Sequence, residues 1–389
     1  MSSRTRLIVM SISAPVIAFA IVGGFLGKVM AGQDAPYQHL KIFDDVVTMI
    51  SSQYVEEVNI DKVMSGAMHG LADGLDPDSA YLTPAQVKQV EAGTPLPPAG
   101  VGLELTRQYY LRVIAARDNS PAAKAGLRTG DYIRAINDLP TREMSVWEGM
   151  RMLRGAAGTK VTVTVIRGNA ADPHVVELVR QAEPPSVVTG RVAAPGVGYI
   201  RIAGISKDTA EQVKTHAADA VKNGATKLIV DVRRVSNGSP EDGLAVARLF
   251  VAKGTLAMRE TKSGPRETIA SAAGDGSITL PAVVLIDTGT SAAAEVFASA
   301  LSGNKRADLI GEHTIGRAAE QKLIKLPDGA GLWLSTMRYL TPAGTPLHEK
   351  GLEPTVVVDD PDVEFGQPAP TADPILEKAL EHLADKKAA

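Results

Sequence analysis

The residues whose types and spacing could do chemistry lie between Asp287 and Gln321, in the stretch DTGTSAAAEVFASALSGNKRADLIGEHTIGRAAEQ. A hydroxyl at the start of a helix, next to a basic group on a later turn, is an arrangement that nucleophilic catalysis uses. Ser291 supplies a hydroxyl where an apolar strand gives way to the helical run AAAEVFASAL. The three residues after it are alanines, and the later turn offers Arg317, whose guanidinium stays protonated. The stretch has the outline of a catalytic site without an obvious pair of reacting groups.

Two interpretations of Ser291 are open. Its hydroxyl could be a displaced nucleophile, or it could be the N-cap of the helix, with Glu295 as a first-turn acid that the helix dipole favours. We favour the cap, because a shift of one residue turns a side chain by about 100° around a helix end.

Three other side chains are candidates for a replacement base. Lys305 lies in the polar turn SGNKR, where we expect it to be solvated. Lys322 lies in an expected strand, where it would face away from the residue before it. His313 follows a strand end, but a lone histidine is more often structural or exposed.

Composition excludes several classes of function. The 389 residues contain 41 basic and 44 acidic side chains, so the chain lacks the basic excess of a nucleic-acid binder. There is no cysteine, which excludes disulfides, thiol nucleophiles and cysteine-bound zinc. The seven histidines are scattered and form no HExxH motif. We therefore expect no metal, no cofactor and no nucleic-acid partner.

The N-terminus predicts a membrane segment. Arg4 and Arg6 precede an uncharged run of 21 residues, Leu7 to Gly27, which is long enough to span a bilayer as a helix. A cleaved signal peptide is the alternative. We favour an uncleaved anchor over residues 1–31, because Lys28 and the residues around Val29–Ala31 match a cleavage site poorly. Either way, we expect the rest of the chain to face a bacterial periplasm.

The remaining chain divides by its patterns into four parts. Residues 37 to 82 have apolar side chains at helical spacing. Residues 100 to 181 combine Val- and Ile-rich strands with two short helices, SPAAKAGL from Ser120 and SVWEGMRMLRG to Gly155, which predicts a small antiparallel module. The predicted boundaries are 1–31 for the anchor, 37–90 for the helical segment, 98–183 for this module, 187–360 for a core domain and 361–389 for a tail with a helix.

The core domain repeats strands and helices. KLIVDVR, AVVLID and ADLIGE are near-continuous apolar strands, typical of a parallel sheet covered on both faces. Amphipathic helices follow from KDTAEQVKTHAADAVKNG and, at the C-terminus, from DPILEKALEHLADKK. We therefore predict a multidomain α/β protein, with an α+β module before an α/β core that has a mostly parallel sheet.

Several of these segments together resemble the C-terminal processing peptidases, also called tail-specific proteases. GLADGLDPDSAYL is similar to that family's helix-to-domain junction, and SPAAKAGLRTGDYIRAIND with MRMLRGAAGTKVTVTVIR is similar to a bacterial PDZ domain. GVGYIRI and GRAAEQKLIKLPDGAGLWLSTMRYLTPAGTPLHEKGLEPTVVV resemble the peptidase core. Each match is short, but their order and spacing agree over residues 37 to 383.

The resemblance implies a serine/lysine dyad that this chain lacks. The family has a nucleophilic serine in a Ser-Ala-Ser-Glu-like run, a lysine 25 residues later and an orienting glutamine four residues after the lysine. With Glu295 fixing the register, these positions hold Ala292, Arg317 and Gln321. The chain therefore keeps the implied glutamine but has neither the nucleophile nor the base.

A third departure lies in the turn that the resemblance assigns to the oxyanion hole. The family pattern is similar to Asp-Leu-Arg-Asn-Asn-Pro-Gly-Gly, and this chain has DVRRVSNGS. It keeps Asp231, Arg233 and Gly238, whereas Ser236 and Asn237 replace the proline and the first glycine. Because an oxyanion hole depends on the placement of its donors, we expect its geometry to be altered.

The resemblance also implies a peptide-binding loop, formed by Gly100, Val101, Gly102, Leu103, Glu104 and Leu105. Backbone N–H groups of such a loop can bind a terminal carboxylate, and the adjacent strand edge can pair with an extended peptide. The implied partners are protein C-termini with apolar last residues. An active paralogous protease and a second copy of the chain are further candidate partners. The hypothesis is a pseudoprotease that binds C-termini or unfolded segments, and the alternative is an active serine endopeptidase that uses Ser291.

Overall fold

The computed structural model describes residues 38–93, 96–168, 172–182, 187–361, 363–367 and 370–385. The predicted anchor lies outside these residues. Within the described ranges, no helix is long and apolar enough to cross a membrane. The described residues divide into two compact units, one that ends at Met68 and one that begins at His69.

The N-terminal helices form where helical periodicity predicts them, at residues 38–53 and in α2 (Ile60–Asp73). An Asx turn follows α2, in which the Asp76 side chain accepts hydrogen bonds from the backbone N–H groups of Asp78 and Ser79, both at 2.8 Å. The expected helical range was too long, because Ala80–Leu82 forms strand β1, and α3 (Pro84–Glu91) then begins with a capping box at Thr83.

The predicted antiparallel module is confirmed as a sheet of order β3-β4-β5-β7-β8, with β6 paired to β5. Helix α4 (Pro121–Lys124) is capped by Ser120, and α5 (Val146–Met152) by a Ser145–Glu148 capping box. Helix α5 ends three residues before the predicted Gly155. The strands are β3 (Leu103–Gln108), β4 (Tyr110–Ala116), β5 (Tyr132–Ile136), β6 (Leu139–Pro140), β7 (Lys160–Ile166) and β8 (His174–Val179), and β2 (Ala99–Gly100) pairs with β9 (Gln181–Ala182).

The predicted mostly parallel sheet is also confirmed, with strand order β10-β11-β12-β15-β16-β19. Only the β10–β11 pair is antiparallel. Its strands are β10 (Val188–Ala194), β11 (Val197–Ile202), β12 (Lys227–Asp231), β15 (Ala282–Ile286), β16 (Ala307–Gly311) and β19 (Val356–Val357).

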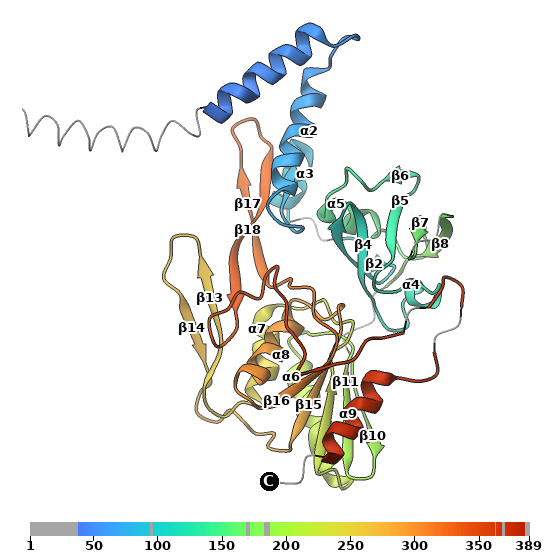
Figure 1. Ribbon diagram of the computed structural model, residues 1–389, viewed down its shortest axis with the longest axis vertical. Helices are drawn as coiled ribbons and strands as arrows, with labels where there is room; N and C mark the ends of the chain where they lie inside the picture. The colour runs from blue at the N-terminus through green and yellow to red at the C-terminus, as the bar shows by residue number, and fades with distance from the viewer. Residues whose placement is uncertain are drawn as a thin grey trace, which may run out of the picture. The chain divides into compact units, whose positions relative to one another are not determined.

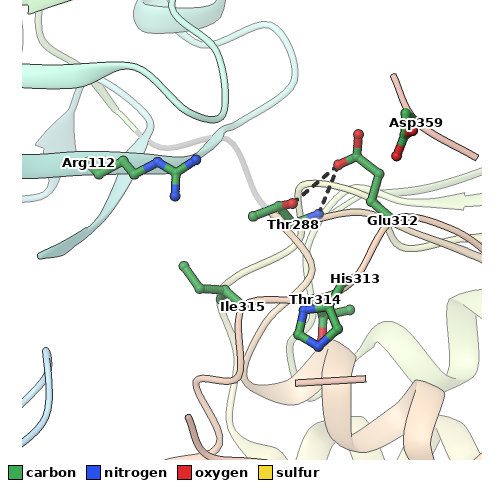
Figure 2. Close-up of a pocket in the computed structure, with 7 residues that line it drawn as sticks. All are labelled: Arg112, Thr288, Glu312, His313, Thr314, Ile315 and Asp359. Atoms are coloured by element: carbon green, nitrogen blue, oxygen red, sulfur yellow. Dashed lines mark hydrogen bonds between the residues drawn. The ribbon is translucent and has the colours of Figure 1, made fainter. Parts of the chain in front are cut away.

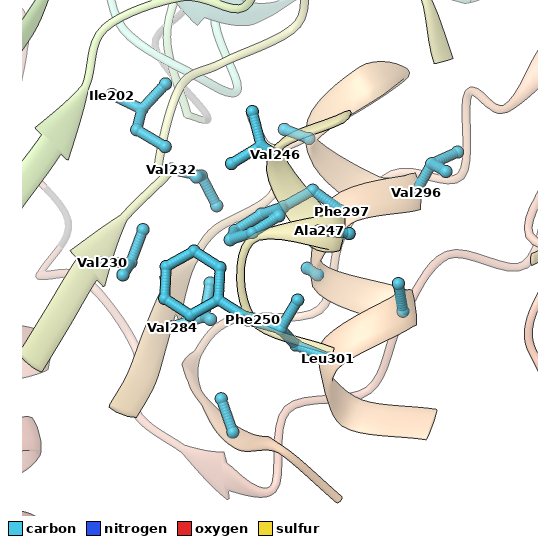
Figure 3. Packing of buried hydrophobic residues seen from close by; sticks show 14 of the residues in the cluster. Ile202, Val230, Val232, Val246, Ala247, Phe250, Val284, Val296, Phe297 and Leu301 are labelled. Atoms are coloured by element: carbon cyan, nitrogen blue, oxygen red, sulfur yellow. The ribbon is translucent and has the colours of Figure 1, made fainter. Parts of the chain in front are cut away.

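Alternate side chains of this sheet are buried on opposite faces. Ile202, Val230 and Val284 pack with Phe250 and Phe297 under helices α7 (Pro240–Arg248) and α8 (Ala293–Gly303), and α6 (Thr209–Lys222) covers the same face (Figures 1 and 3). The other face packs against α9 (Pro374–Asp385), which buries Ile375, Ala379 and Leu383 at i, i+4 and i+8. The strands' near-continuous apolar sequence follows from burial on both faces.

A third sheet was not predicted. Strand β18 (Gly331–Leu340) pairs with β1, β13 and β17, and all of these pairs are antiparallel. Most side chains of these strands are half-buried or exposed, so their sequences show no clear apolar alternation. The remaining members of this sheet are β13 (Thr255–Thr261), β14 (Glu267–Ala270) and β17 (Ala319–Lys325).

Candidate functional site

The turn between β15 and α8 has the backbone of a strained functional turn. Ala292 has φ +52° and ψ −119°, a conformation that L-residues other than glycine rarely adopt. Such outliers persist where the surrounding structure imposes them, and sharp strand-to-helix turns often present a nucleophile. Here the strained residue has only a methyl side chain, so the turn presents no reactive atom.

Ser291 does not cap the helix, so that prediction was wrong. Helix α8 begins at Ala293, which makes Ala292 the N-cap residue, and this residue has no side-chain cap. The Ser291 side chain is fully buried, and its hydroxyl has no hydrogen-bond partner among the described residues. In this structure solvent does not reach the hydroxyl of the alternative nucleophile.

Glu295 joins the helix to the later turn. Its carboxylate accepts hydrogen bonds from the Thr314 hydroxyl at 2.5 Å and from the backbone N–H groups of Gly316 and Arg317 at 2.7 and 2.8 Å. Burial raises the pKa of Glu295 to about 7, although these hydrogen bonds lower it. It lies in the first turn of α8 as predicted, but its role in holding the two turns together was missed.

Arg317 points out of this turn into a set of fixed partners. Its guanidinium forms a bidentate ion pair with Asp78, with Nη2–Oδ1 at 2.5 Å and Nε–Oδ2 at 3.1 Å. Its Nη1 donates to the backbone carbonyl of Leu105 at 3.0 Å. Burial opposes the charge, but Asp78 keeps the pKa of Arg317 above its usual value. The group at the expected base position is a permanently charged donor that already makes three hydrogen bonds.

Gln321 lies apart from this cluster of contacts. Its amide donates to the Ser335 hydroxyl at 3.1 Å and to the Ala319 carbonyl at 3.4 Å. Among the described residues, Gln321 makes no hydrogen bond with Arg317, so the two are not brought together as the resemblance implies. Lys305, Lys322 and His313 are exposed, and His313 forms a loose pair with Glu353 at 3.6 Å.

The turn after β12 is tied to the nucleophile turn by Asp287. Its carboxylate accepts from the backbone N–H of Arg234 at 2.8 Å and from the Thr290 hydroxyl at 3.0 Å. Burial raises the pKa of Asp287 to about 6. Arg234 has φ +59°, a region in which asparagine is tolerated better than arginine. Gly238 has φ +95°, and a Cβ there would meet the Ile205 carbonyl oxygen at 2.6 Å.

An ion network lies under this turn. Asp231 is buried and accepts from Arg233 Nη2 at 2.7 Å and from the Tyr199 hydroxyl at 2.6 Å. Arg201 lies 3.5 Å from Asp231 and 2.9 Å from Asp118 in the β4–α4 loop. Burial opposes the ionisation of Asp231, but Arg201 and Arg233 hold its pKa well below the usual range. Arg201 lies in the stretch GVGYIRI that resembles the peptidase core, but nothing in that stretch or around Asp118 indicates that the two form an ion pair, so sequence reasoning missed it.

The PDZ-like module contacts the nucleophile turn directly. A Cβ at Gly289 would meet the carbonyl oxygen of Ile114 in β4 at 2.6 Å, so only a glycine fits beside this strand. A cleft of about 490 Å³ lies next to this contact. Thr288 and Glu312 hydrogen-bond on its wall (Figure 2), and the cleft is lined by Arg112, Thr288, Glu312, His313, Thr314, Ile315 and Asp359.

The predicted peptide-binding loop leads into the free edge of the module. Gly100 ends β2, Gly102 has φ +75°, and a Cβ at Gly102 would meet the Cβ of Ser120 at 2.2 Å. Strand β3 has a partner on one side only within the five-stranded path of its sheet. The side chains of Leu103 and Leu105 are buried in the module, so a peptide at this edge would meet the backbone of β3.

Comparison with known proteins gives consistent matches. The model of peptidase family S41 matches residues 196–358, and a PDZ domain model matches residues 112–167. The carboxyl-terminal-processing protease of Synechocystis sp. is 32% identical over 315 residues, which cover 79% of this chain and 74% of that protein. The carboxy-terminal processing protease CtpA of Bacillus subtilis is 31% identical, with 80% and 67% covered. The solved structure of a photosystem II D1 C-terminal processing protease matches with a TM-score of 0.68 and 27% identity, covering 82% of this chain and 92% of that one.

Proposed function

The chain belongs to the carboxyl-terminal processing proteases of peptidase family S41, and from this membership we propose that it binds protein C-termini through its PDZ domain without hydrolysing them. The relatives named above are proteases that process C-termini. The PDZ domain, the core sheet and the strained turn at Ala292 are present here. The proposal separates the two capacities of the family, because recognition and hydrolysis depend on different residues.

The observation that supports the loss of hydrolysis is the position of Arg317. A base must accept a proton from the nucleophile, and a lysine does so only when its pKa is depressed. Arginine stays protonated, and the pair with Asp78 raises the pKa of Arg317 further. The protonated guanidinium has no free lone pair. Three of its N–H groups, on Nε, Nη1 and Nη2, are directed at Asp78 and at the Leu105 carbonyl.

The absence of a nucleophile adds to this argument. Ala292 holds the strained position, and Ser291 next to it is buried. In other serine hydrolases, loss of the nucleophile costs on the order of 10⁶ in kcat. This corresponds to about 8 kcal/mol of activation free energy.

The cellular setting belongs to the same proposal. The uncharged run from Leu7 to Gly27, preceded by Arg4 and Arg6, supports a bacterial inner-membrane anchor with the PDZ and core domains in the periplasm. In that place, a binder of C-termini would act as an adaptor, a decoy or a regulatory subunit of an active protease.

The test uses the purified full-length chain in detergent, with an unfolded protein as substrate and a labelled peptide that ends in an apolar residue. We expect no cleavage, saturable binding of the peptide, and loss of binding when the same peptide carries a C-terminal amide. Gly102→Ala should abolish binding, because its Cβ would meet Ser120. Gly126→Ala is the control and should leave binding intact, because Gly126 has a similar positive φ but open space around the added Cβ.

Two results would contradict the proposal in different ways. Cleavage by the unmodified chain that disappears in Ser291→Ala would establish the alternative, an active endopeptidase with a displaced nucleophile. Equal binding of the free-acid and amidated peptides would remove C-terminal recognition and leave a scaffold without this specificity.

A further inference from the structure

The carbonyl of Leu105 points to the free edge of the PDZ sheet. In an antiparallel pair, two opposite residues either exchange both backbone hydrogen bonds or neither. Leu105 lies opposite Val113, and Val113 uses its N–H with Asp131 and its carbonyl with Gly130, both at 2.8 Å. Leu105 and Val113 therefore do not bond to each other, and the backbone groups of Leu105 face away from β4.

A peptide added to this edge would use those groups. An extended peptide whose carboxylate lies at Gly100–Gly102 would run antiparallel to β3. Its last residue would lie beside Leu103 and its third-last residue beside Leu105, since paired positions advance together along two strands. Peptides of one or two residues would not reach Leu105, whereas longer ones would need its carbonyl as an acceptor.

The guanidinium of Arg317 lies against this outward-facing carbonyl, where the N–H of an added peptide would have to approach. Arg317 Nη1 donates to it at 3.0 Å, and the rest of the guanidinium is held by Asp78. The Arg317 backbone is fixed in turn, because its N–H donates to the buried carboxylate of Glu295. Arg317 thus reaches from the core domain to Leu105 of the edge strand β3, the residue beside which the third-last residue of a peptide would lie.

We infer that Arg317 sets how many residues of a C-terminus the PDZ domain pairs with. With Arg317 in place, the edge pairs with the last two residues and gains nothing from residues further upstream. Longer pairing requires the guanidinium to leave the Leu105 carbonyl. This inference rests on the proposed recognition of C-termini, and it makes Arg317 a determinant of specificity in place of a base.

The experiment compares an N-acetylated dipeptide with an N-acetylated hexapeptide that ends in the same two apolar residues. Both are titrated against a labelled hexapeptide on the full-length chain. For the unmodified chain, we expect the two affinities to agree within about threefold. In Arg317→Met, which keeps the apolar stem, the hexapeptide should bind up to about tenfold more tightly, the upper end of the effect of one backbone hydrogen bond. Affinity for the dipeptide should not change.

Two further variants make the result specific. Arg317→Lys retains a charge for Asp78 but lacks the forked guanidinium whose Nη1 reaches the Leu105 carbonyl. It should therefore raise hexapeptide affinity in the same direction even if Arg317→Met does not fold. Arg338→Met removes an arginine of β18 that pairs with Glu260 at 2.8 Å, and it should change neither affinity.

The outcomes separate the two levels of the argument. If neither peptide binds any of the variants, the proposed recognition of C-termini fails, and the inference fails with it. If both peptides bind but the Arg317 variants leave their ratio unchanged, or shift both equally, recognition stands and the role of Arg317 is wrong.

Discussion

Arg317 and Asp78, 239 positions apart in the sequence, form a bidentate ion pair with Nη2–Oδ1 at 2.5 Å. The pair ties the segment after α2 to the turn that follows β16. It also decides what a basic residue at position 317 can do, because a neighbouring carboxylate stabilises the protonated form of any amine placed there. The Asp78 side chain is only 8% exposed, so solvent weakens this effect little.

The first prediction concerns restoration of the dyad. Ala292→Ser combined with Arg317→Lys should remain without measurable peptidase activity, because Asp78 would keep the new lysine charged. Adding Asp78→Asn removes that carboxylate and should give hydrolysis at least about 100-fold above the double variant, within the contribution typical of a general base. Release of new N-termini from an unfolded protein measures it.

Ala292→Ser with Asp78→Asn alone is the matched control, since it has a hydroxyl and no base. If Ala292→Ser with Arg317→Lys were as active as the triple variant, Asp78 would not control the protonation of the lysine at position 317.

The second prediction concerns pH. The pKa of Glu295 is raised to about 7, so between about pH 4.5 and 7 the folded chain holds a proton that the unfolded chain has released. The contribution of Glu295 to the free energy of unfolding is therefore fully present in acid. It falls as pH rises, by roughly 3 kcal/mol between about pH 4.5 and 7. Glu295→Gln cannot titrate, so the cost of the substitution should be largest near pH 5 and smallest above pH 7.

Unfolding temperatures of both chains between pH 4.5 and 8 measure this difference. The pKa of Asp287 is raised to about 6, so this group also lowers the stability as pH rises. It does so equally in the unmodified chain and in Glu295→Gln, and its effect cancels in the difference between them. A difference between the chains that stays constant over this range would contradict the assignment.

Local patterns predicted much of this architecture. The apolar runs of β12, β15 and β16 and the i, i+4, i+8 positions Ile375, Ala379 and Leu383 encode burial directly, and the α/β type of the core domain follows from them. The cap of α4 at Ser120 was predicted for the same reason, since serine before proline is a local signal.

Features that depend on backbone strain or on distant partners were missed. Nothing in the letters around Ser291 shows that the helix begins one residue later, at a positive φ of Ala292. The pair of Arg317 with Asp78 joins segments that no periodicity relates. The third sheet was missed because its strands are mostly half-exposed and lack the alternation that identifies a strand.

The third prediction concerns the contact between the PDZ domain and the nucleophile turn. Gly289→Ala would place a Cβ 2.6 Å from the Ile114 carbonyl and 3.0 Å from the Cα of Arg234. We expect β4 to separate from the turn, at a cost of about 1–3 kcal/mol. Faster amide exchange in residues 110–116 and a lower unfolding temperature measure it.

Gly70→Ala is its control, because Gly70 lies within α2 with no atom within 4 Å of the added Cβ. It should stabilise the helix by up to about 1 kcal/mol. Unchanged exchange in β4 of Gly289→Ala would mean that the contact does not hold the two parts together.

The last prediction compares two aspartates of one ion network. Asp231 is buried between Arg233 and Arg201 and also accepts from the Tyr199 hydroxyl, whereas the Asp118 side chain is 27% exposed and contacts Arg201 from the PDZ side. Asp231→Asn would leave two buried arginines without their shared counter-charge, which typically costs about 3–5 kcal/mol. Asp118→Asn removes a more solvated charge and should cost about 1 kcal/mol or less.

Urea unfolding of the two variants at pH 7 measures both costs. Because the pKa of Asp231 is depressed, its contribution is complete at this pH and is lost only in acid. Equal costs for the two substitutions would show that burial between the arginines does not determine the role of Asp231.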